Sequence, residues 1–492
     1  MATASIPKQQ RAVQLVGPDQ LTINETKPVL EPGPYQILCR VEVCGLCFSD
    51  LKLLKQFSGH ARKSEIASGI NKQILGEMAN YVPGEKPTVP GHETVVRVVK
   101  VGNQVTKYKV GERYLVQADY RWISTPNSAA AFGYNFEGGL QEYTLFDERV
   151  IHAPDGESTL IPAPEEFPAS AIALCEPWAC VEEAYIEKQR QTLREGDVVY
   201  HGSDPAEVER LFTTVPTNGL MVICQHGGKF GRPVVTPVGR THYGGIRIVG
   251  TTGDKVEDAL ASIPATAEIR PNDKINIIGA AGPMGTMHVI RDLCQGVPGI
   301  TVFAGDLSDD RLVMLKKLAE PLAQKNKLTL RPYNPQKDKL TEQFNYIVLM
   351  APVPALVVQA VKDAAPKAII NIFAGIPADK TAEIDLDAYI AEQCYFVGTS
   401  GSTTEDMKTV LKKVMSKQLD TNLSVAAISG IDGAIDGIRA VEKNLMPGKI
   451  IVYPFAKGMK LTPLTELKNV PLRNGHWTAE AEEALKKEYA GK

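Results

Sequence analysis

The segment INIIGAAGPMG, residues 275–285, constrains the fold of this 492-residue chain more than any other feature. An apolar run typical of a buried strand leads directly into Gly279, Gly282 and Gly285, and a helical pattern follows. Glycine permits the tight turn and lets backbone amides approach a pyrophosphate at the helix N-terminus. The segment therefore predicts a dinucleotide-binding α/β domain, although a tight strand–helix turn without a ligand is the alternative interpretation.

The residues after this loop indicate which dinucleotide to expect. The next apolar run ends in VFAGD, which places Asp306 21 residues after Gly285, where a carboxylate can hydrogen-bond the ribose hydroxyls of NAD. Asp309 and Asp310 follow and would repel the 2′-phosphate of NADP. We therefore expect NAD rather than NADP. The expected cofactor-binding residues are Gly279, Gly282, Pro283, Met284, Gly285, Asp306 and Leu307.

Two kinds of pattern divide the chain. Strand and helix patterns alternate over residues 272–415, which predicts a doubly wound, mostly parallel sheet. The first part instead has short β-branched runs bounded by Gly and Pro, such as YQILCRVEVCG. We expect a β-rich domain, an inserted segment and a doubly wound dinucleotide-binding domain of the Rossmann type. Their expected ranges are 1–190 together with 418–492, 191–270, and 271–417.

An internal repeat explains the inserted segment. A constant offset of 148 residues aligns residues 197–262 with 345–410 without gaps. Chance similarity between two strand–helix–strand stretches is the alternative, but several matches in one register favour duplication of half of the α/β domain. Because the extra copy has no Gly-rich loop, we do not expect it to bind a second dinucleotide; it should extend the sheet or build a subunit interface. The residues that match their counterparts are Gly227, Val249, Gly250, Thr251, Gly253, Glu257 and Asp258.

The segment CGLCFSD, residues 44–50, contains two cysteines three positions apart. A redox pair would be expected at a helix N-terminus in a small βαβ domain, whereas this segment ends a β-type run. A structural zinc site needs four ligands, usually from two such pairs, and the sequence has no second pair. The remaining interpretation is a catalytic site that takes one cysteine from this segment and its other ligands from elsewhere.

Candidates for those other ligands lie downstream. VPGHETV contains His92 and Glu93, and LCEPWAC contains Glu176. A cysteine, a histidine and a carboxylate offer Zn²⁺ a thiolate, an imidazole and a hard oxygen, and they leave the fourth position for water or substrate. Taken alone, each of these residues is more often structural than a ligand. Together they predict a catalytic zinc site.

Five elements occur in one order along the chain: CGLCFSD, PGHE, GERY with FEGGLQEY, EPWAC, and GAAGPMG with a later aspartate. This arrangement resembles the zinc-dependent medium-chain alcohol and polyol dehydrogenases, especially the branch of sorbitol dehydrogenase and sorbose-1-phosphate reductase. The resemblance covers most of the chain except the inserted segment and the C-terminal tail. It implies an α/β fold in which a β-rich, GroES-like catalytic domain is joined to a Rossmann domain, here with a duplicated half-Rossmann insertion.

The resemblance also assigns roles to residues. It implies that Cys47, His92, Glu93 and Glu176 are metal ligands, without deciding which glutamate is the carboxylate ligand, and that Cys44 is not a ligand. Ser49 would start the proton relay, Asp50 would orient His92, and Lys52 stands where the family usually has a relay histidine. The implied catalytic residues are Cys47, Ser49, His92 and Glu93.

The implied activity is zinc- and NAD(H)-dependent interconversion of a secondary alcohol and a ketone on a sugar, polyol or sugar phosphate. One alternative is a zinc-free enzyme resembling the quinone reductases, which lack the Cys/His/Glu set. Another is a non-catalytic NAD-binding redox sensor in which Cys44 and Cys47 form a regulatory disulfide. The sequence departs from the family in having no four-cysteine zinc lobe and in its extra residues 58–86. These residues suggest a helical lid whose basic side chains either contact a phosphate or form a solvated face, the interpretation we favour.

Composition limits the possible partners. The formal net charge is −3 without a Lys/Arg-rich run, so we expect no nucleic-acid partner. No apolar stretch approaches the length of a membrane span, and the first residues lack the apolar core of a signal peptide, so we expect a cytoplasmic protein without a membrane partner. Eight cysteines in 492 residues do not suggest a disulfide scaffold. We expect a small-molecule substrate and a homo-oligomer, either a dimer or a tetramer.

Overall fold

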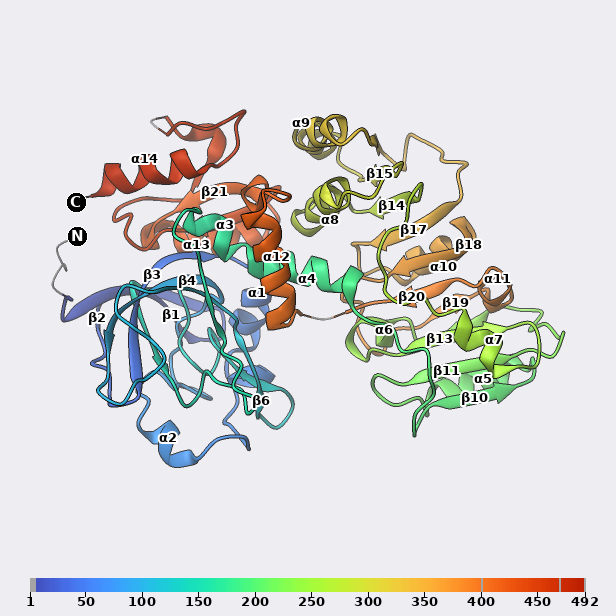
Figure 1. Cartoon of the computed structure of the whole chain (residues 1–492), viewed down its shortest axis with the longest axis horizontal. Helices are drawn as coiled ribbons and strands as arrows, with labels where there is room; N and C mark the ends of the chain where they lie inside the picture. Colours follow the sequence, from blue (N-terminus) through green and yellow to red (C-terminus); the bar gives the residue numbers. More distant parts are fainter. Residues whose placement is uncertain (1–5, 400, 469, 491–492) are drawn as a thin grey trace. The chain divides into compact units, whose positions relative to one another are not determined.

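The computed structural model describes residues 6–399, 401–468 and 470–490. Two compact units divide the chain, and each is described by itself: unit 1 is Met1–Trp178 with Thr403–Lys492, and unit 2 is Ala179–Ser402 (Figure 1). The sequence prediction placed the corresponding boundaries at 190 and 418 and separated the insert as a third domain. None of the helices in the described part of the chain combines the length and apolarity that crossing a bilayer requires.

Unit 1 is built on an eight-stranded sheet to which the C-terminal part of the chain adds three strands. Most neighbours are antiparallel, and strand β22 from the C-terminal part pairs with strand β3 near the N-terminus. The path through the sheet is β23 (Thr462–Pro463), β21 (Val425–Ser429), β22 (Lys449–Val452), β3 (Gln36–Gly45), β4 (Glu93–Val101), β5 (Arg113–Val116) and β9 (Leu160–Pro162), with β8 (Tyr143–Asp147) also on β3. Two small sheets accompany it, formed by β1 (Gln9–Gly17) with β2 (Gln20–Pro28) and by β6 (Asp119–Ser124) with β7 (Ala129–Ala131).

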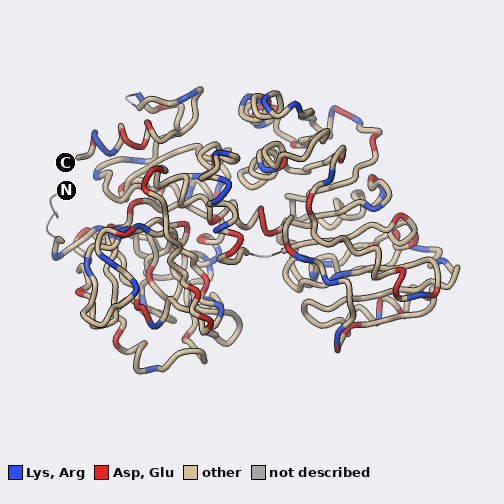
Figure 2. The backbone as a smooth tube through the Cα atoms, in the orientation of Figure 1, with Lys and Arg blue, Asp and Glu red and all other residues tan. Residues whose placement is uncertain are grey.

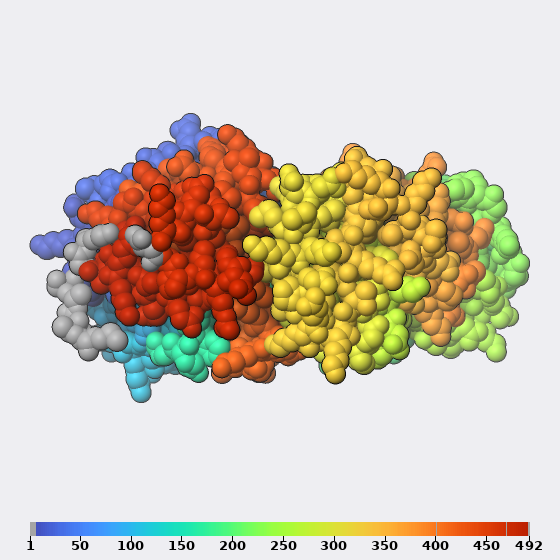
Figure 3. Space-filling model, turned by 90° about the horizontal axis from the view of Figure 1, so that it is seen from above, coloured from blue at the N-terminus to red at the C-terminus, as the bar shows by residue number. Residues whose placement is uncertain are grey.

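The helices of unit 1 are short, and the last one corrects an expectation from the sequence. They are α1 (Phe48–Gln56), α2 (Lys72–Gly76), α3 (Ala169–Ala173), α12 (Thr404–Met415), α13 (Ile431–Glu442) and α14 (Ala479–Tyr489). The sequence of the C-terminal tail, TAEAEEALKKEYAGK, predicts an exposed helix. It is helical, but Glu482 is fully buried and accepts hydrogen bonds from the backbone N–H groups of Ala169 and Ser170 at the start of α3. In Figure 3 the C-terminal segment, coloured red, forms a continuous part of the unit 1 surface.

Unit 2 contains the predicted doubly wound sheet. Its six strands are all parallel, because apolar runs alternate with helices that cross over the sheet. In spatial order they are β16 (Thr329–Tyr333), β15 (Thr301–Gly305), β14 (Lys274–Ile278), β17 (Phe344–Leu349), β18 (Ala364–Asn371) and β20 (Tyr395–Val397). The helices are α8 (Pro283–Cys294), α9 (Asp309–Lys325), α10 (Pro354–Asp363) and α11 (Leu386–Ala391), and α4 (Cys175–Ile186) enters from unit 1. The first strand, β14, lies where the strand order reverses, which is where such sheets bind ligands.

The insert forms its own three-stranded parallel sheet in unit 2 and does not extend the six-stranded one. Its elements are β10 (Val198–His201), α5 (Pro205–Phe212), β11 (Leu220–Cys224), β12 (Val234–Thr236), α6 (Gly239–Tyr243), β13 (Arg247–Thr251) and α7 (Val256–Ala261). An offset of 148 residues superimposes these, in order, on β17, α10, β18, β19 (Ala382–Ile384), α11, β20 and α12. The secondary structure therefore follows the sequence repeat through all seven elements.

Charged residues of both signs are interleaved along the backbone of both units (Figure 2). This distribution agrees with the small net charge of −3. Many of the charges are paired with an opposite charge that is adjacent in space, as in the ion pairs Arg11–Asp432, Arg97–Glu165 and Arg232–Glu209. The charge pattern therefore gives no support to a polyanion as a partner.

Candidate functional site

Three of the predicted metal ligands meet in unit 1. Cys47, His92 and Glu93 each bring one ligand atom to a group in which all three atoms lie within 4.8 Å of one another. Strand pairing brings the three residues together, because Gly45 at the end of β3 pairs with Glu93 at the start of β4. The residues just beyond these two positions, Cys47 and His92, are thereby brought to the same edge of the sheet.

Gly45 leaves the space that Glu93 occupies. A Cβ atom at Gly45 would lie 2.2 Å from Glu93 Oε2, so any larger residue would displace this carboxylate. The other oxygen, Oε1, accepts a hydrogen bond of 2.5 Å from Nζ of Lys449. Oε2 is buried and has no hydrogen-bond partner among the described residues. A buried carboxylate oxygen without a partner is costly, and a metal ion is one species that would satisfy it.

Ser49 and Asp50 surround the histidine and the thiol at the start of α1. Ser49 Oγ lies 3.1 Å from Cys47 Sγ and 3.2 Å from His92 Nε2. Asp50 Oδ1 lies 3.2 Å from His92 Nδ1, and Oδ2 accepts a hydrogen bond from the backbone N–H of Cys47. Burial lowers the pKa of His92, but Asp50, Tyr134 and Cys47 together outweigh burial and hold the pKa well above its ordinary value. With Nδ1 on Asp50, Nε2 is the nitrogen that faces the thiol.

Glu176 lies near this group without being part of it. It stands in the first turn of α4 and is buried. Burial raises the pKa of Glu176 to about 7; His92 opposes the shift and Glu93 adds to it, so the three side chains influence one another. The structure thus groups Glu93 with Cys47 and His92, and leaves Glu176 as a second carboxylate beside them.

Sequence reasoning missed Lys449. Its side chain is buried, and Glu93 raises the pKa of the ammonium group against the opposing effect of burial. The signal available in the sequence was a lysine directly before the apolar run IIVYPF, where a charged side chain must either leave the strand or find a partner. Its partner was not predictable locally, because Glu93 lies more than 350 residues earlier in the chain.

The donor set fits Zn²⁺. Thiolate, imidazole and carboxylate are the ligand types that zinc takes in proteins, and three protein ligands with one open position are typical of catalytic sites. Cys44 differs from Cys47: it is fully buried, burial raises the pKa of its thiol, and its Sγ accepts a hydrogen bond from Thr94. Cys47 is therefore the cysteine whose position suits a metal, and Cys44 packs in the core of unit 1.

The glycine loop of unit 2 has the geometry that the sequence predicted. Gly279 follows β14 with a φ of +89°, which favours glycine, and Gly282 is the N-cap of α8 with Pro283 as its first residue. A Cβ atom at Gly285 would lie 2.2 Å from the carbonyl oxygen of Gly279, so this turn cannot close around a larger residue. The twelve-residue helix α8 thus begins at the loop with its amide groups available to a phosphate.

Asp306 lies at the end of β15 beside this loop. Its Oδ2 accepts a hydrogen bond of 3.1 Å from the backbone N–H of Ala281, and the next residue, Leu307, is 64% exposed. Asp309 forms an ion pair with Lys337, which weakens the repulsion that was expected to exclude a 2′-phosphate. Asp306 therefore remains the residue on which the expectation of NAD depends.

Two basic residues of segment 58–86, Arg62 and Lys63, do not belong to the solvated face that we favoured, whereas Lys72 is exposed. Lys63 is fully buried, and its ammonium group donates to the backbone carbonyls of Val82 and Lys86. Arg62 pairs with Asp119 and lies over the ring of Tyr134. These side chains fix the segment on unit 1, and neither points freely into solvent.

Comparisons with known proteins agree with this arrangement. Residues 33–155 match the model of the alcohol dehydrogenase GroES-like domain. The chain is 23% identical over 451 residues to the uncharacterized protein YggP of Escherichia coli, covering 86% of this chain and 87% of that protein. It is also 23% identical over 490 residues to L-sorbose 1-phosphate reductase of Klebsiella pneumoniae, covering 96% of each.

Among solved structures, the fold is similar to that of 2R,3R-butanediol dehydrogenase from Bacillus subtilis. The TM-score is 0.57 at 18% identity, and the match covers 90% of this chain and 99% of that one. The predicted fold class, a GroES-like domain with a Rossmann domain, is confirmed. The resemblance to zinc-dependent medium-chain dehydrogenases that the motifs indicated is confirmed as well.

Proposed function

We propose that this chain, built as a medium-chain dehydrogenase, is a zinc-dependent NAD(H) oxidoreductase that interconverts a secondary alcohol and a ketone on a sugar, polyol or sugar phosphate. The observation that carries the proposal is the group of Cys47, His92 and Glu93, with Ser49 in contact with two of its members. The similarity to L-sorbose 1-phosphate reductase over 96% of the chain supports a carbohydrate-derived substrate.

Cys47, His92 and Glu93 would hold the metal, with Glu176 as a nearby carboxylate able to replace Glu93 or a water molecule. Zn²⁺ bound there would supply a Lewis acid for the substrate oxygen. Asp50 fixes the ring of His92 and directs Nε2 toward the thiol. Lys449 neutralises part of the negative charge that a thiolate and two carboxylates would otherwise concentrate in a buried site.

Ser49 is the residue placed to move the proton of the substrate hydroxyl. Its Oγ lies within hydrogen-bond distance of both Cys47 Sγ and His92 Nε2, so a hydroxyl group at the metal site would be within its reach. Lys52 is exposed and stands three positions later in α1, on the same face of the helix. Ser49 and Lys52 together give a route from the buried site to the surface.

The glycine loop and Asp306 would hold the dinucleotide. The start of α8 presents backbone amides to a pyrophosphate, and Asp306 presents a carboxylate to the ribose. NAD bound there would supply the hydride acceptor. In the opposite direction, the same residues would position NADH for reduction of a ketone.

Metal analysis tests the zinc site. Purified protein should contain about one zinc per chain by elemental mass spectrometry, the stoichiometry of a single catalytic site. Cys47→Ser should remove most of the zinc, and Cys44→Ala, at the other cysteine of the same segment, should retain it. A metal-free protein that still binds NAD would contradict the proposal and favour a redox sensor or a zinc-free reductase. Loss of zinc in Cys44→Ala alone would contradict the ligand assignment.

A substrate panel tests the activity. Polyols and ketoses, free and phosphorylated, should be offered with NAD or NADH, and turnover followed by absorbance of the reduced cofactor. We expect turnover of at least one carbohydrate derivative by the zinc-loaded protein and its loss in Ser49→Ala. Turnover of quinones but of no carbohydrate would instead favour the zinc-free alternative.

A further inference from the structure

The insert and the segment it duplicates pair with each other symmetrically. Strands β12 and β19 are antiparallel, and Val235 faces Glu383 at the centre of the pair. These two residues occupy the same position of the repeat, 148 residues apart. On either side, Val234 faces Ile384 and Thr236 faces Ala382, so exchanging the two copies reproduces the pairing. This is the pattern of a local two-fold axis that passes between Val235 and Glu383.

Contacts outside β12 and β19 show the same two-fold symmetry between the two copies. A Cβ atom at Gly398 would lie 3.1 Å from Cα of His242, and one at Gly250 would lie 2.7 Å from Cγ1 of Ile390. Gly250 and Gly398 are repeat equivalents, as are His242 and Ile390. Helix α6 of the insert therefore packs against the residue that follows β20, and α11 of the parent segment packs against the equivalent residue of β13.

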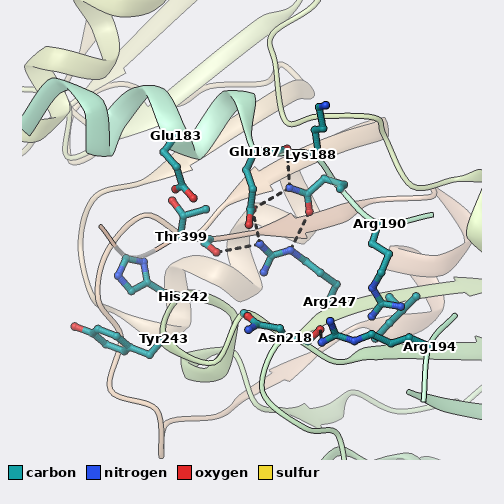
Figure 4. A pocket seen from close by; sticks show the side chains of 14 residues that line it. Glu183, Glu187, Lys188, Arg190, Arg194, Asn218, His242, Tyr243, Arg247 and Thr399 are labelled. Carbon is teal, nitrogen blue, oxygen red and sulfur yellow. Dashed lines mark hydrogen bonds and ion pairs between the residues drawn. The ribbon is translucent and has the colours of Figure 1, made fainter. Parts of the chain in front are cut away.

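A third set of contacts also involves equivalent residues of the two copies. Arg247 Nε and the Tyr395 hydroxyl both donate to Oε1 of Gln189, over 3.1 Å and 2.9 Å. Arg247 and Tyr395 are again repeat equivalents. Arg247 also reaches Glu187 and the carbonyl of Gly398 at a polar cavity of about 460 Å³, shown in Figure 4. The segment that leads into the insert thus binds the same position of both copies.

The two copies share one apolar core. Tyr389 of the parent segment is fully buried, and its hydroxyl donates to the carbonyl of Ile248 in the insert over 2.8 Å. An apolar face of this kind resembles an obligate subunit interface rather than a transient contact. The buried residues that form it include Val234, Val238, Ile246 and Ile248 from the insert, and Ile384, Leu386, Tyr389, Ile390 and Phe396 from the parent segment.

We propose that the insert, residues 197–262, occupies within one chain the place that a second copy of residues 345–410 would take in a two-fold dimer. A self-complementary surface normally pairs with the same surface of another subunit. Here the duplicated segment supplies that surface within the same chain. The face is therefore covered inside one chain and does not form a contact between two chains. Any homo-oligomer of this protein must then use a different face.

Cysteine cross-linking of the full-length chain tests this directly. Val235 and Glu383 are exposed and face each other, and facing residues in an antiparallel pair lie close enough for a disulfide after small adjustments. In Val235→Cys/Glu383→Cys, mild oxidation should give a bond within one chain, seen as a monomer on a non-reducing gel and as a two-hydrogen mass loss. A covalent dimer would overturn the proposal, as would failure of the bond to form.

The single variant Glu383→Cys is the decisive control. If parent segments paired between chains about the same axis, residue 383 would face its own copy, and this variant would become a covalent dimer on oxidation. We expect it to remain monomeric on the non-reducing gel, as should Val235→Cys and the unaltered chain. A covalent dimer of Glu383→Cys that is absent from the unaltered chain would contradict the internal closure. The readout is mass alone, so it does not depend on zinc, NAD or activity.

Discussion

Lys449 donates a hydrogen bond of 2.5 Å to Glu93, and both side chains are buried. The two residues meet because β22 pairs with β3, and β3 in turn pairs with β4. The C-terminal return of the chain thus contributes a charge to a site whose other members lie in the first 176 residues. Folding of the C-terminal segment and assembly of the candidate metal site therefore both depend on the Lys449–Glu93 interaction.

Removal of Lys449 should therefore destabilise the protein strongly. In Lys449→Met the stem of the side chain is kept but Glu93 remains buried without its cation, and breaking such a pair costs about 3–5 kcal/mol. Denaturant unfolding of zinc-depleted protein measures the loss. The double variant Lys449→Met/Glu93→Gln removes both charges and should recover most of it. A loss below about 1 kcal/mol in the single variant would show that Glu93 is not held as a charged group.

The close approach of Gly45 to Glu93 gives a second prediction. In Gly45→Ala the new methyl group would lie 2.2 Å from Glu93 Oε2, so the carboxylate must move and zinc content should fall at least severalfold. Gly76→Ala is the matched control, because its Cβ would meet no atom within 4 Å. Elemental analysis of both variants after identical purification decides the point. Full zinc content in Gly45→Ala would indicate that Glu176, and not Glu93, is the carboxylate ligand.

Asp306 should determine the choice of cofactor. Asp306→Asn keeps a group that can accept from Ala281 but removes the charge offered to the ribose, and a hydrogen bond to a charged group contributes about 1.5–3 kcal/mol. Affinity for NADH, followed by fluorescence titration, should fall about tenfold or more, with a smaller effect on NADPH. Asp309→Asn serves as the control, because Lys337 already pairs with Asp309 and the change should alter NADH binding little. Equal losses in both variants would contradict the assignment.

Local sequence signals predicted the features that depend on neighbouring residues. The glycine loop, its strand and its helix were predictable because the turn, the cap and the apolar run lie within twenty residues of one another. The grouping of Cys47 with His92 was not a local signal; the resemblance to the dehydrogenases implied it, and the structure brings both residues to one sheet edge. The repeat was visible because it keeps one register over 66 residues.

Features that depend on distant parts of the chain were not predictable. Glu482 looked like one of several charges on an exposed helix, and only the packing of α14 reveals that it caps α3. The symmetric pairing of Val235 with Glu383 could not be foreseen either, since strand pairing between the copies depends on how two separate sheets pack. In both cases the sequence contains the residues, but the partner is set by tertiary contacts.

A buried cluster in α8 predicts how stability depends on pH. Burial raises the pKa of Asp292 to about 8, against the effect of Arg291, and the Tyr185 hydroxyl donates to its carboxyl group. The folded state therefore keeps a proton that the unfolded chain releases near pH 4. The stabilisation from Asp292 is fully present below that pH, declines as the pH rises toward 8, and is lost above pH 8. The neighbouring His288 has the opposite sign, because burial lowers its pKa to about 3.

The window between about pH 7 and 8 mainly reports Asp292, because His288 is mostly neutral there in both states. In this window the free energy of unfolding should fall by up to about 1.4 kcal/mol per pH unit from Asp292 alone. Asp292→Asn keeps the shape of the side chain without a titrating proton, so its unfolding free energy should depend less steeply on pH than that of the unaltered chain. Asp310→Asn, at an exposed position of α9, should leave the slope unchanged. Parallel pH profiles for the unaltered chain and Asp292→Asn would mean that Asp292 is ionised in the folded protein and that Arg291 outweighs its burial.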